Sequence, residues 1–534
     1  MAGLQFHSHP FGLLCAMPAL LGSFAHADVI RVPADRPTIQ SAINAARAGD
    51  EILVAPGRYA ELINFAGKAV TVRSVAGPES TIIDADGRAG SAVSFISGET
   101  SASRLEGFTI RGVRGTAQSR ASAIRITQAS PTIVDCIITE NVGVPAGGAA
   151  VVGGSPAFIG VRFVANSGVE AGGLSVVGAS IDLSGVVFDN NIGSAGGIFA
   201  AASSLSIEQA TFSRNGSSSS GGSGAGLSLL GSQFEIERST FVGNGTAEDL
   251  PGGGQVFATF AGGGVYAIES RGTIDACRFV GNAAARGGGV YFRSTAEGEQ
   301  IVVTNTLFNA NEAGAASGAV YTAQQDAAFI NTTFVDNAGA LFTDFNAEAL
   351  IANSILFRNV FGSPAGQVSG NGMTRIVYSL VPTQASRSVT LGEGNITDRS
   401  PRFIDSNGLD NIAGTIDDDF RLANTSAGVD AGRNDFLSAS ILLDLAGESR
   451  FVDDPVVDDT GVGTGAIVDM GAFEFAPNAR CRADFNRDGF VDWFDAELYF
   501  ERFEEGSASA DFDGDGFIDW FDLDAFLTAF DRGC

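Results

Sequence analysis

The sequence has little histidine and lysine. Its three histidines are His7, His9 and His26, all near the N-terminus, and Lys68 is the only lysine. A chain cut after Ala27 has no histidine, which excludes Ser-His-Asp and Cys-His catalysis and histidine-based metal sites. Positive charge is also scarce, since 32 Lys and Arg residues stand against 61 acidic residues, for a net charge of −29. We expect no nucleic-acid partner, because phosphate groups would be repelled, whereas bound cations are compatible with this charge.

Long apolar runs are missing after Ala27, so we expect no transmembrane span. Residues 11–24 form an apolar segment broken by Pro18, and residues 25–27 (Ala-His-Ala) form an A-x-A cleavage pattern. The segment before the apolar run contains no Lys or Arg, which is atypical of a leader. We predict a signal peptide at residues 1–27 and a product that is secreted or associated with the cell surface.

Proline is rare, with 15 residues, whereas glycine is abundant, with 70 residues, and hydrophobic residues make up 45% of the chain. A disordered chain would lack this apolar content. The composition therefore favours a repetitive β structure with many tight turns.

From about residue 130 to 360 the sequence repeats itself in units of 22 to 38 residues. Each unit has an apolar residue, usually Phe, three positions before an Asn. The asparagines are Asn141, Asn166, Asn191, Asn215, Asn244, Asn282, Asn311, Asn337 and Asn359. Most units continue with a small-residue run and an aliphatic residue, as in Gly172-Gly173-Leu174. We expect Asn and Gly to supply special turn conformations.

An apolar residue also stands eight positions before each of the first eight asparagines. These residues are Ile133, Phe158, Leu183, Ile207, Ile236, Ile274, Val303 and Phe329. The positions on either side of this column are mixed, as alternation along a strand predicts. One unit is too short to bury its own apolar face, so the units must stack, with strands about 4.8 Å apart. A leucine-rich repeat is the main rival, but its Leu ladder is missing.

The paired small-residue and Phe-x-x-Asn motifs resemble the repeats of polymorphic outer-membrane adhesins and of pectate-lyase-like β-helix proteins. Residues 37–50 predict a short amphipathic helix, and with residues 54–61 they are similar to the N-terminal cap and first coil of such proteins. The Asp-rich stretch that ends in residues 469–474 resembles their closing segment. The resemblance implies an all-β, right-handed parallel β-helix over residues 28–400 and a C-terminal cap over 401–476 that protects the last open edge.

Two acidic loops follow the predicted cap. The first, starting at Asp484, offers oxygen ligands at positions 1, 3, 5, 7, 9 and 12 of a calcium loop, with glycine at position 6, and the second repeats the pattern from Asp511. The predicted ligands are Asp484, Asn486, Asp488, Phe490 (carbonyl), Asp492, Asp495, Asp511, Asp513, Asp515, Phe517 (carbonyl), Asp519 and Asp522. Residues 481–534 hold 15 acidic and 4 Arg side chains, a net charge of −11. We therefore predict calcium as the cofactor.

Asp instead of Glu at position 12, in tandem loops at the end of the chain, resembles dockerin modules. Cys481 and the terminal Gly533-Cys534 resemble the GC-type dockerin-like anchors. The resemblance implies a small α-helical EF-hand/dockerin-like module over residues 477–534, a Cys481–Cys534 disulfide, and a cohesin-like or cell-envelope partner. Dockerins contact partners at positions that hold Trp493-Phe494 and Trp520-Phe521 here, and we expect at least one aromatic residue of each pair to be core.

Carboxylates occupy outward strand positions in neighbouring repeats. Glu208, Glu237 and Asp275 stand seven positions before their asparagines, and Asp182 and Glu235 stand nine positions before theirs. On one sheet they would form an acidic patch, with neighbours about 5 Å apart, which can raise a carboxyl pKa or recruit a cation. Paired carboxylates also suit glycoside hydrolysis, although outward charge is the normal state of a strand.

Aromatic residues form a second outward column, comprising Tyr266, Tyr291, Tyr321 and Phe342. Such a ladder either stacks on sugar rings or stabilises the sheet by itself.

A polysaccharide lyase needs a base, and Lys68, Arg238 and Arg278 are the basic candidates. Lys68 is remote in sequence from the acidic patch, and an arginine base needs special surroundings. Polygalacturonase signatures are not found. Cys136 and Cys277 occupy the same repeat position five units apart, about 24 Å, and are therefore expected to be buried thiols.

The sequence favours a secreted, calcium-binding β-helix, anchored by the dockerin-like module, that presents a surface to carbohydrate or the cell envelope. A polysaccharide-degrading lyase or glycoside hydrolase and an adhesin are the alternatives.

Overall fold

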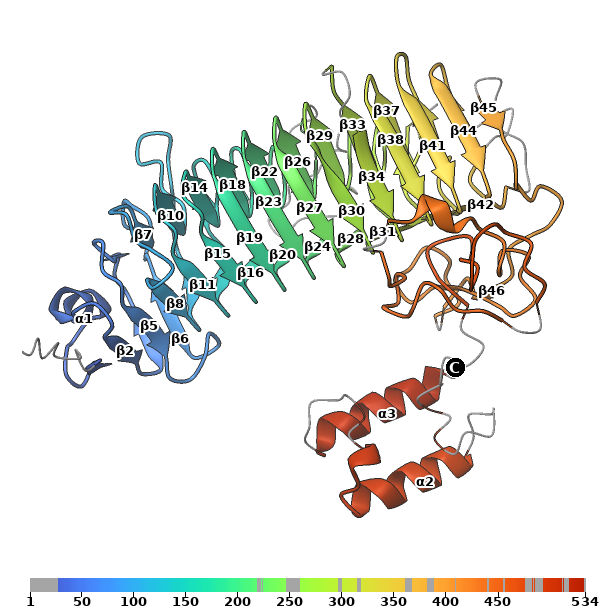
Figure 1. Cartoon of the computed structure of the whole chain (residues 1–534). Helices are drawn as coiled ribbons and strands as arrows, with labels where there is room; N and C mark the ends of the chain where they lie inside the picture. Colours follow the sequence, from blue (N-terminus) through green and yellow to red (C-terminus); the bar gives the residue numbers. More distant parts are fainter. Residues whose placement is uncertain are drawn as a thin grey trace, which may run out of the picture.

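The computed structural model describes residues 27–218, 222, 224–245, 260–295, 300–314, 318–360, 367–381, 389–408, 410–438, 441–454, 457–475, 483, 485, 493–510, 512 and 518–532. The predicted leader and most of the predicted calcium loops lie outside these residues. Most of the described chain forms three long sheets that run side by side along one stack of coils (Figure 1). The pairing within all three sheets is parallel, so the predicted parallel β-helix is present.

Sheet A has 15 strands and forms the first side of each coil. Its strands are β1 (Val29–Val32), β2 (Glu51–Val54), β5 (Thr71–Ser74), β8 (Arg104–Glu106), β11 (Thr132–Val134), β15 (Ala157–Ile159), β19 (Ser180–Ser184), β23 (Ser204–Glu208), β27 (Gln233–Glu237), β30 (Arg271–Asp275), β34 (Gln300–Thr304), β38 (Asp326–Ile330), β41 (Glu348–Ala352), β44 (Met373–Val377) and β45 (Val389–Leu391).

Sheet B has 12 strands and forms the second side. Its strands are β3 (Gly57–Tyr59), β6 (Thr81–Asp84), β9 (Thr109–Arg111), β12 (Ile137–Thr139), β16 (Arg162–Val164), β20 (Val187–Asp189), β24 (Thr211–Ser213), β28 (Thr240–Val242), β31 (Arg278–Val280), β35 (Leu307–Asn309), β39 (Thr333–Val335) and β42 (Ile355–Phe357).

Sheet C also has 12 strands and closes each coil. Its strands are β4 (Ile63–Asn64), β7 (Val93–Phe95), β10 (Ile124–Thr127), β14 (Ala149–Val152), β18 (Leu174–Val177), β22 (Ile198–Ala201), β26 (Leu227–Leu230), β29 (Val265–Ile268), β33 (Val290–Arg293), β37 (Val320–Ala323), β40 (Leu341–Thr343) and β43 (Val368–Gly370). Short strands pair between sheets B and C: β13 (Val142–Gly143), β17 (Ser167–Gly168), β21 (Ile192–Gly193) and β25 (Gly216–Ser217), and separately β32 (Ala283–Ala284) and β36 (Glu312–Ala313).

The predicted columns fill the interior. All eight residues of the apolar column are at most 2% exposed. The phenylalanines three positions before Asn form a ladder from Phe163 to Phe334, in which neighbouring rings stack with centroids 4.5 to 5.0 Å apart. The paired glycines pack against this ladder, because a Cβ at Gly173 would meet a ring carbon of Phe188 at 2.6 Å. Glycine is therefore required there by contact rather than by a turn conformation.

The asparagines form a second ladder, buried between sheets B and C. Each side chain from Asn141 to Asn337 donates to a main-chain carbonyl and to the next asparagine, as in Asn215 Nδ2 to Phe188 O (2.7 Å) and to Asn244 Oδ1 (3.0 Å), and the last one, Asn359, donates to Gln367 Oε1 instead. The left-handed backbone belongs to the preceding residue, such as Arg214 (φ 51°), and not to the asparagine. The expectation that these asparagines supply the turn conformation is therefore wrong. They satisfy buried polar groups instead.

The N-terminal end is closed by α1 (Ile39–Ala45), the predicted short helix, whose Ile39, Ala42 and Ile43 are buried. At the other end, residues 401–475 form a segment that we call the cap. It contains the antiparallel pair β46 (Phe403–Asp405) and β47 (Asp419–Leu422) and the short 3₁₀ helix η1 (Asn434–Phe436).

The described contacts of the cap reach two parts of the β-helix. We expected it to protect the open edge of the last coil, and it meets that coil where Phe436 packs on Tyr378 and Arg433 pairs with Glu393. It also packs along the outer side of sheet B. Phe420 and Phe473 bury Leu307 of β35 and Val335 of β39, and Met470 lies in a cluster with Ile355 of β42. These outward strand positions are apolar because the cap covers them.

The helices α2 (Trp493–Glu504) and α3 (Trp520–Arg532), with the 3₁₀ helix η2 (Ala508–Ala510), form the C-terminal module. Its core is the stacked pair Tyr499 and Phe526, with centroids 3.8 Å apart. Among the described residues, no helix is long and apolar enough to cross a membrane.

Candidate functional site

The outer side of sheet A carries three rows of side chains, all polar except Val302, across five strands from β19 to β34. We call these rows the polar face. They are Ser180, Ser204, Gln233, Arg271 and Gln300, then Asp182, Ser206, Glu235, Thr273 and Val302, and finally Ser184, Glu208, Glu237, Asp275 and Thr304. Parallel in-register pairing aligns the members of each row, so neighbours are one strand apart, about 4.8 Å.

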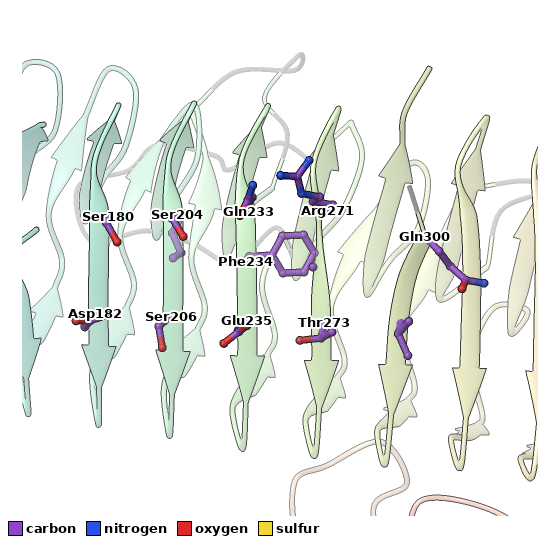
Figure 2. A pocket seen from close by; sticks show the side chains of 13 residues that line it. Ser180, Asp182, Ser204, Ser206, Gln233, Phe234, Glu235, Arg271, Thr273 and Gln300 are labelled. Carbon is purple, nitrogen blue, oxygen red and sulfur yellow. The ribbon is translucent and has the colours of Figure 1, made fainter. Parts of the chain in front are cut away.

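The first two rows line an open groove of about 400 Å³ (Figure 2). Small side chains from β19 and β23 leave space on one side, and the longer Gln233, Arg271 and Gln300 border it on the other. Gly272 of β30 also lines the groove and lets Phe234 lie close beside it, because a Cβ at this position would meet a Phe234 ring carbon at 2.8 Å. The groove therefore offers hydroxyl, amide, guanidinium and carboxylate groups along one line.

The third row brings together the predicted carboxylates. Glu208, Glu237 and Asp275 lie on adjacent strands, as expected from their common repeat position. Arg238, in the turn after β27, donates to Glu208 and lies 3.4 Å from a Glu237 oxygen. The hydrogen bond to Glu208 raises the pKa of Arg238. Arg238 is thus held protonated as a cation between two carboxylates, which excludes it as a general base.

A cleft of about 650 Å³ separates the end of the third row from cap residues 441–447. Glu237, Arg238, Asp275 and Arg278 line it on the β-helix side. Asp275 accepts from the Thr304 hydroxyl and from Asn305 Nδ2 at 3.0 Å, and Asn305 also donates to Leu443 O of the cap at 3.1 Å. These hydrogen bonds therefore fix the orientation of the Asp275 carboxylate, and the cap forms one wall of the cleft.

Arg278 lies deep in this cleft, with its guanidinium 5.6 Å from the centre of the Phe473 ring. Burial lowers its pKa. A guanidinium nevertheless remains protonated near neutral pH, because its ordinary pKa lies above 12. Arg278 can bind an oxygen of a ligand, but its surroundings do not make it a base.

Lys68 is not part of this site. Its Nζ donates to the carbonyls of Ile43, Asn44 and Ala46 at 2.7 to 2.8 Å, at the C-terminal end of α1. It lies in the coil of β4 and β5, whereas the carboxylates lie on β23, β27 and β30. Lys68 therefore pairs with the free main-chain carbonyls at the end of α1, and it lies several coils away from the third row of carboxylates.

The aromatic column is present on sheet C. Tyr266, Tyr291, Tyr321 and Phe342 stack with centroids 5.0 to 5.3 Å apart. Tyr291 and Tyr321 are only 5% exposed, and the Arg286 guanidinium lies 5.6 Å from the Tyr321 ring centre. Since these rings contact one another, the ladder offers little free ring surface to a sugar. Its role in carbohydrate binding stays a prediction.

Three of the predicted calcium ligands are described. Asp495 and Asp522 are at most 1% exposed at the starts of α2 and α3. The Asp522 carboxylate accepts from Phe512 N (2.6 Å) and Asp519 N (2.8 Å). The other ligands and the cysteines of the predicted disulfide lie outside the described residues: Asp484, Asn486, Asp488, Phe490, Asp492, Asp511, Asp513, Asp515, Phe517, Cys481 and Cys534. Calcium binding and the disulfide stay predictions.

The aromatic residues beside these loops lie at the surface. Trp493 is 68% exposed, Trp520 75% and Phe521 72%. The expectation that one residue of each aromatic pair is core is wrong for Trp520 and Phe521, because Tyr499 and Phe526 fill the space between the helices. Cys136 and Cys277 are free and buried, as predicted.

Sequence reasoning missed the first row of the polar face. Its residues stand eleven positions before their asparagines, so the alternation that identified the acidic rows also marks them. The contribution of cap residues 441–447 has no such signal, because no repeat connects them to sheet A.

Comparison with known proteins supports the fold. A family model described as the right-handed beta helix region matches residues 172–373. No curated protein matches the chain significantly. Among solved structures, pectin methylesterase from Erwinia chrysanthemi has 12% identity and a TM-score of 0.27, covering 46% of this chain and 89% of that one. The catalytic unit of an alpha-1,3-glucanase from Streptomyces thermodiastaticus has 13% identity and a TM-score of 0.34, covering 66% of each.

Pectate lyase Pel9A has 13% identity and a TM-score of 0.28, covering 84% of this chain and 96% of that one. Similarities this distant do not assign an activity. The family model and the parallel sheets together establish that this chain contains a right-handed parallel β-helix.

Proposed function

We propose that the protein is exported and binds a neutral polysaccharide strand along the polar face of sheet A. The observation that carries this proposal is the set of aligned, exposed polar side chains over the groove of about 400 Å³. Successive coils repeat about every 4.8 Å, which is similar to the length of one sugar unit in an extended chain. An extended glycan can therefore meet the same kinds of groups on each coil.

The negative charge of the polar face favours a neutral glycan over an acidic one. Asp182, Glu208, Glu235, Glu237 and Asp275 outnumber Arg238 and Arg271, so the described face is net negative. A polyuronate would be repelled in the absence of a bridging cation. Neutral sugars donate hydroxyl hydrogens to carboxylates, and charge-assisted hydrogen bonds of this kind are the stronger ones.

We further propose that the C-terminal module binds calcium and attaches the β-helix to a cohesin-like or cell-envelope partner. Buried Asp495 and Asp522 support calcium binding, since an acidic residue at position 12 is part of the loop's ligand set. Exposed Trp493, Trp520 and Phe521 support docking, because exposed aromatic groups are enriched at protein interfaces.

Cleavage of the glycan is the second candidate. It is favoured by Glu237 and Asp275 on adjacent strands of one cleft, at a strand separation close to the spacing of about 5 Å between retaining-glycosidase carboxylates. The protonated Arg238 and Arg278 disfavour a lyase mechanism, because neither is suited to abstract a proton.

The test is equilibrium binding of neutral and acidic oligosaccharides to protein without residues 1–27, with product analysis by mass spectrometry. We expect binding of a neutral glycan and at least a tenfold weaker affinity in Glu235→Ala, because one charge-assisted hydrogen bond contributes about 1.5–3 kcal/mol. Glu348→Ala is the matched control, since Glu348 is exposed on β41 of the same sheet outside the polar face.

Binding of acidic glycans alone would contradict the proposed ligand class. No binding to any glycan would contradict the function and favour an adhesin with a protein ligand. Shortened products would favour the enzyme, and Glu208, Glu237 and Asp275 would be the residues to replace.

A further inference from the structure

Three carboxylates of the cap converge far from the predicted calcium loops. One oxygen from each of Asp430, Asp453 and Asp459 lies within 4.8 Å of the others. Asp453 and Asp459 are exposed, whereas Asp430 is fully buried. Two oxygens that share one calcium ion are at most about 5 Å apart, because calcium–oxygen distances are about 2.3–2.6 Å. The three side chains therefore already have a spacing that one calcium ion can bridge.

Asp430 provides an independent indication of a ligand. Among the described residues its buried Oδ1 has no hydrogen-bond partner, and its Oδ2 accepts only a long bond from Asp454 N, at 3.3 Å. Buried carboxylate oxygens normally have partners, since an unpaired one loses its hydration without compensation. The main chain holds Asp430 in place, because its carbonyl accepts from Thr460 N and Gly461 N at 3.0 Å each.

Three neighbouring buried carboxylates are different, because main-chain N–H groups, joined by Arg450 at Glu474, donate to both oxygens of each. Asp469 accepts from Asp430 N (2.7 Å) and Phe475 N, and Glu474 accepts from Val452 N, Asp469 N and Arg450. Asp444 accepts from Ala446 N, Glu448 N and Glu474 N. Among Asp430, Asp444, Asp469 and Glu474, Asp430 is the member that lacks such a set of donors.

The charges around Asp430 are also unbalanced. Asp430, Asp444, Asp454, Asp469 and Glu474 are all at most 5% exposed, and Arg450 is the one fully buried basic side chain among the described residues. Burial, followed by the charges of Asp459 and Asp453, raises the pKa of Asp430 to about 6. A cation placed between the three aspartates would supply the missing positive charge beside the exposed surface.

We propose that the cap contains a calcium site formed by Asp430, Asp453 and Asp459, separate from the C-terminal loops. The oxygen-only ligand set selects a hard cation, and the open side, where Asp453 and Asp459 are exposed, leaves room for water ligands. Magnesium fits less well, because it demands near-ideal octahedral geometry and keeps most of its water ligands, whereas calcium accepts irregular sets of oxygen ligands. The bound ion would join Asp430 to Asp453 and Asp459 and so cross-link separate parts of the cap.

The site can be tested in the full chain after both C-terminal loops are disabled by Asp488→Asn and Asp515→Asn. Calcium stoichiometry is measured by equilibrium dialysis, and the cap variant is Asp453→Asn with Asp459→Asn. These side chains are exposed, so their replacement should leave the fold intact, which circular dichroism verifies. Asp458→Asn is the matched control, because Asp458 is an exposed neighbour outside the cluster.

We expect one calcium ion per chain in the loop-disabled protein and in the Asp458→Asn control. The cap variant should lose this ion or bind it at least tenfold more weakly, and calcium should no longer raise its melting temperature. Calcium that remains bound at equal affinity in the cap variant would overturn the proposal, as would a loop-disabled protein that binds none.

The loops can be followed separately by terbium luminescence excited through tryptophan. Trp493 and Trp520, the only tryptophans, directly follow loop residues Asp492 and Asp519. A terbium signal in the unmodified protein that survives the cap variant reports intact loops. Failure of the cap site is thereby distinguished from failure of calcium binding by the C-terminal module.

Discussion

Replacement of Asn244 by alanine tests the buried asparagine ladder. The Asn244 side chain makes four hydrogen bonds: it donates to Phe212 O (2.8 Å) and Asn282 Oδ1 (2.9 Å), and it accepts from Asn215 N (3.1 Å) and Asn215 Nδ2 (3.0 Å). Alanine removes all four and leaves the buried Asn215 N–H without its acceptor. That unpaired donor costs about 1–3 kcal/mol, and each other bond contributes about 1 kcal/mol. We therefore expect the free energy of unfolding to fall by about 4–6 kcal/mol.

The assay is urea denaturation followed by circular dichroism at fixed calcium concentration. Asn44→Ala is the control, because Asn44 is exposed near the end of α1 and the hydrogen bond that its side chain accepts from Gln40 is also exposed. We expect the control to change the free energy of unfolding by less than about 0.5 kcal/mol.

A double variant sharpens the test. Asn215→Ala with Asn244→Ala should lose less stability than the sum of the single variants, because both single variants remove the same bond from Asn215 Nδ2 to Asn244 Oδ1. Asn166→Ala with Asn337→Ala should be additive, since these residues are six coils apart, about 29 Å. A loss below about 1 kcal/mol for Asn244→Ala would refute the view that the ladder satisfies buried polar groups.

Three other predictions concern the interior and the C-terminal module. Gly173→Ala should reduce the free energy of unfolding, measured by urea denaturation, by about 2–3 kcal/mol, because its Cβ would meet Phe188 and Gly197 O at 2.6 Å. Gly178→Ala is the control: it has open space around it and should show only the smaller cost of its positive φ. Cys136 and Cys277 should not react with a thiol reagent at pH 8 in the folded protein, because burial raises the pKa of Cys136 to about 12 and raises that of Cys277 as well. In denaturant, protein without residues 1–27 should show two reactive thiols if Cys481 and Cys534 are bonded, and four would contradict that disulfide. The double variant Trp520→Ala, Phe521→Ala should no longer capture the partner of the module, while the module still binds calcium in equilibrium dialysis. Full capture of the partner by this variant would exclude these two residues from docking.

The repeat made most of the β-helix predictable from sequence. Residues equivalent to Ile236 and Phe241 stand at the same distances from the Asn of every repeat. Each of them packs on the equivalent residue of the adjacent coil, which explains why the residue type is repeated. The same offsets placed Glu208, Glu237 and Asp275 in one row, because in-register pairing preserves repeat position across strands. The alternation that marks Glu235 also marks Gln233 and Arg271, so the whole polar face can be found from sequence.

Other features do not follow from local pattern. Leu307 and Val335 are outward apolar residues whose burial depends on the cap, which comes much later in the chain. The burial of Tyr291 depends on its contacts with neighbouring rings, and burial of the Asp430 carboxylate depends on the fold of an irregular segment. From sequence alone, a turn conformation was the expected role of the repeated Asn. The hydrogen bonds between their side chains join residues of adjacent coils, so they appear only once the coils are stacked.

The most direct test of carbohydrate binding by the polar face compares two variants against one neutral oligosaccharide by titration calorimetry. Glu235→Ala removes a carboxylate of the groove, and Tyr266→Ala removes the half-buried end of the aromatic ladder on sheet C. We predict that Glu235→Ala weakens the affinity at least tenfold and that Tyr266→Ala leaves it within twofold. The reverse result, with affinity lost only in Tyr266→Ala, would contradict the assignment of the polar face and place the glycan on the aromatic ladder.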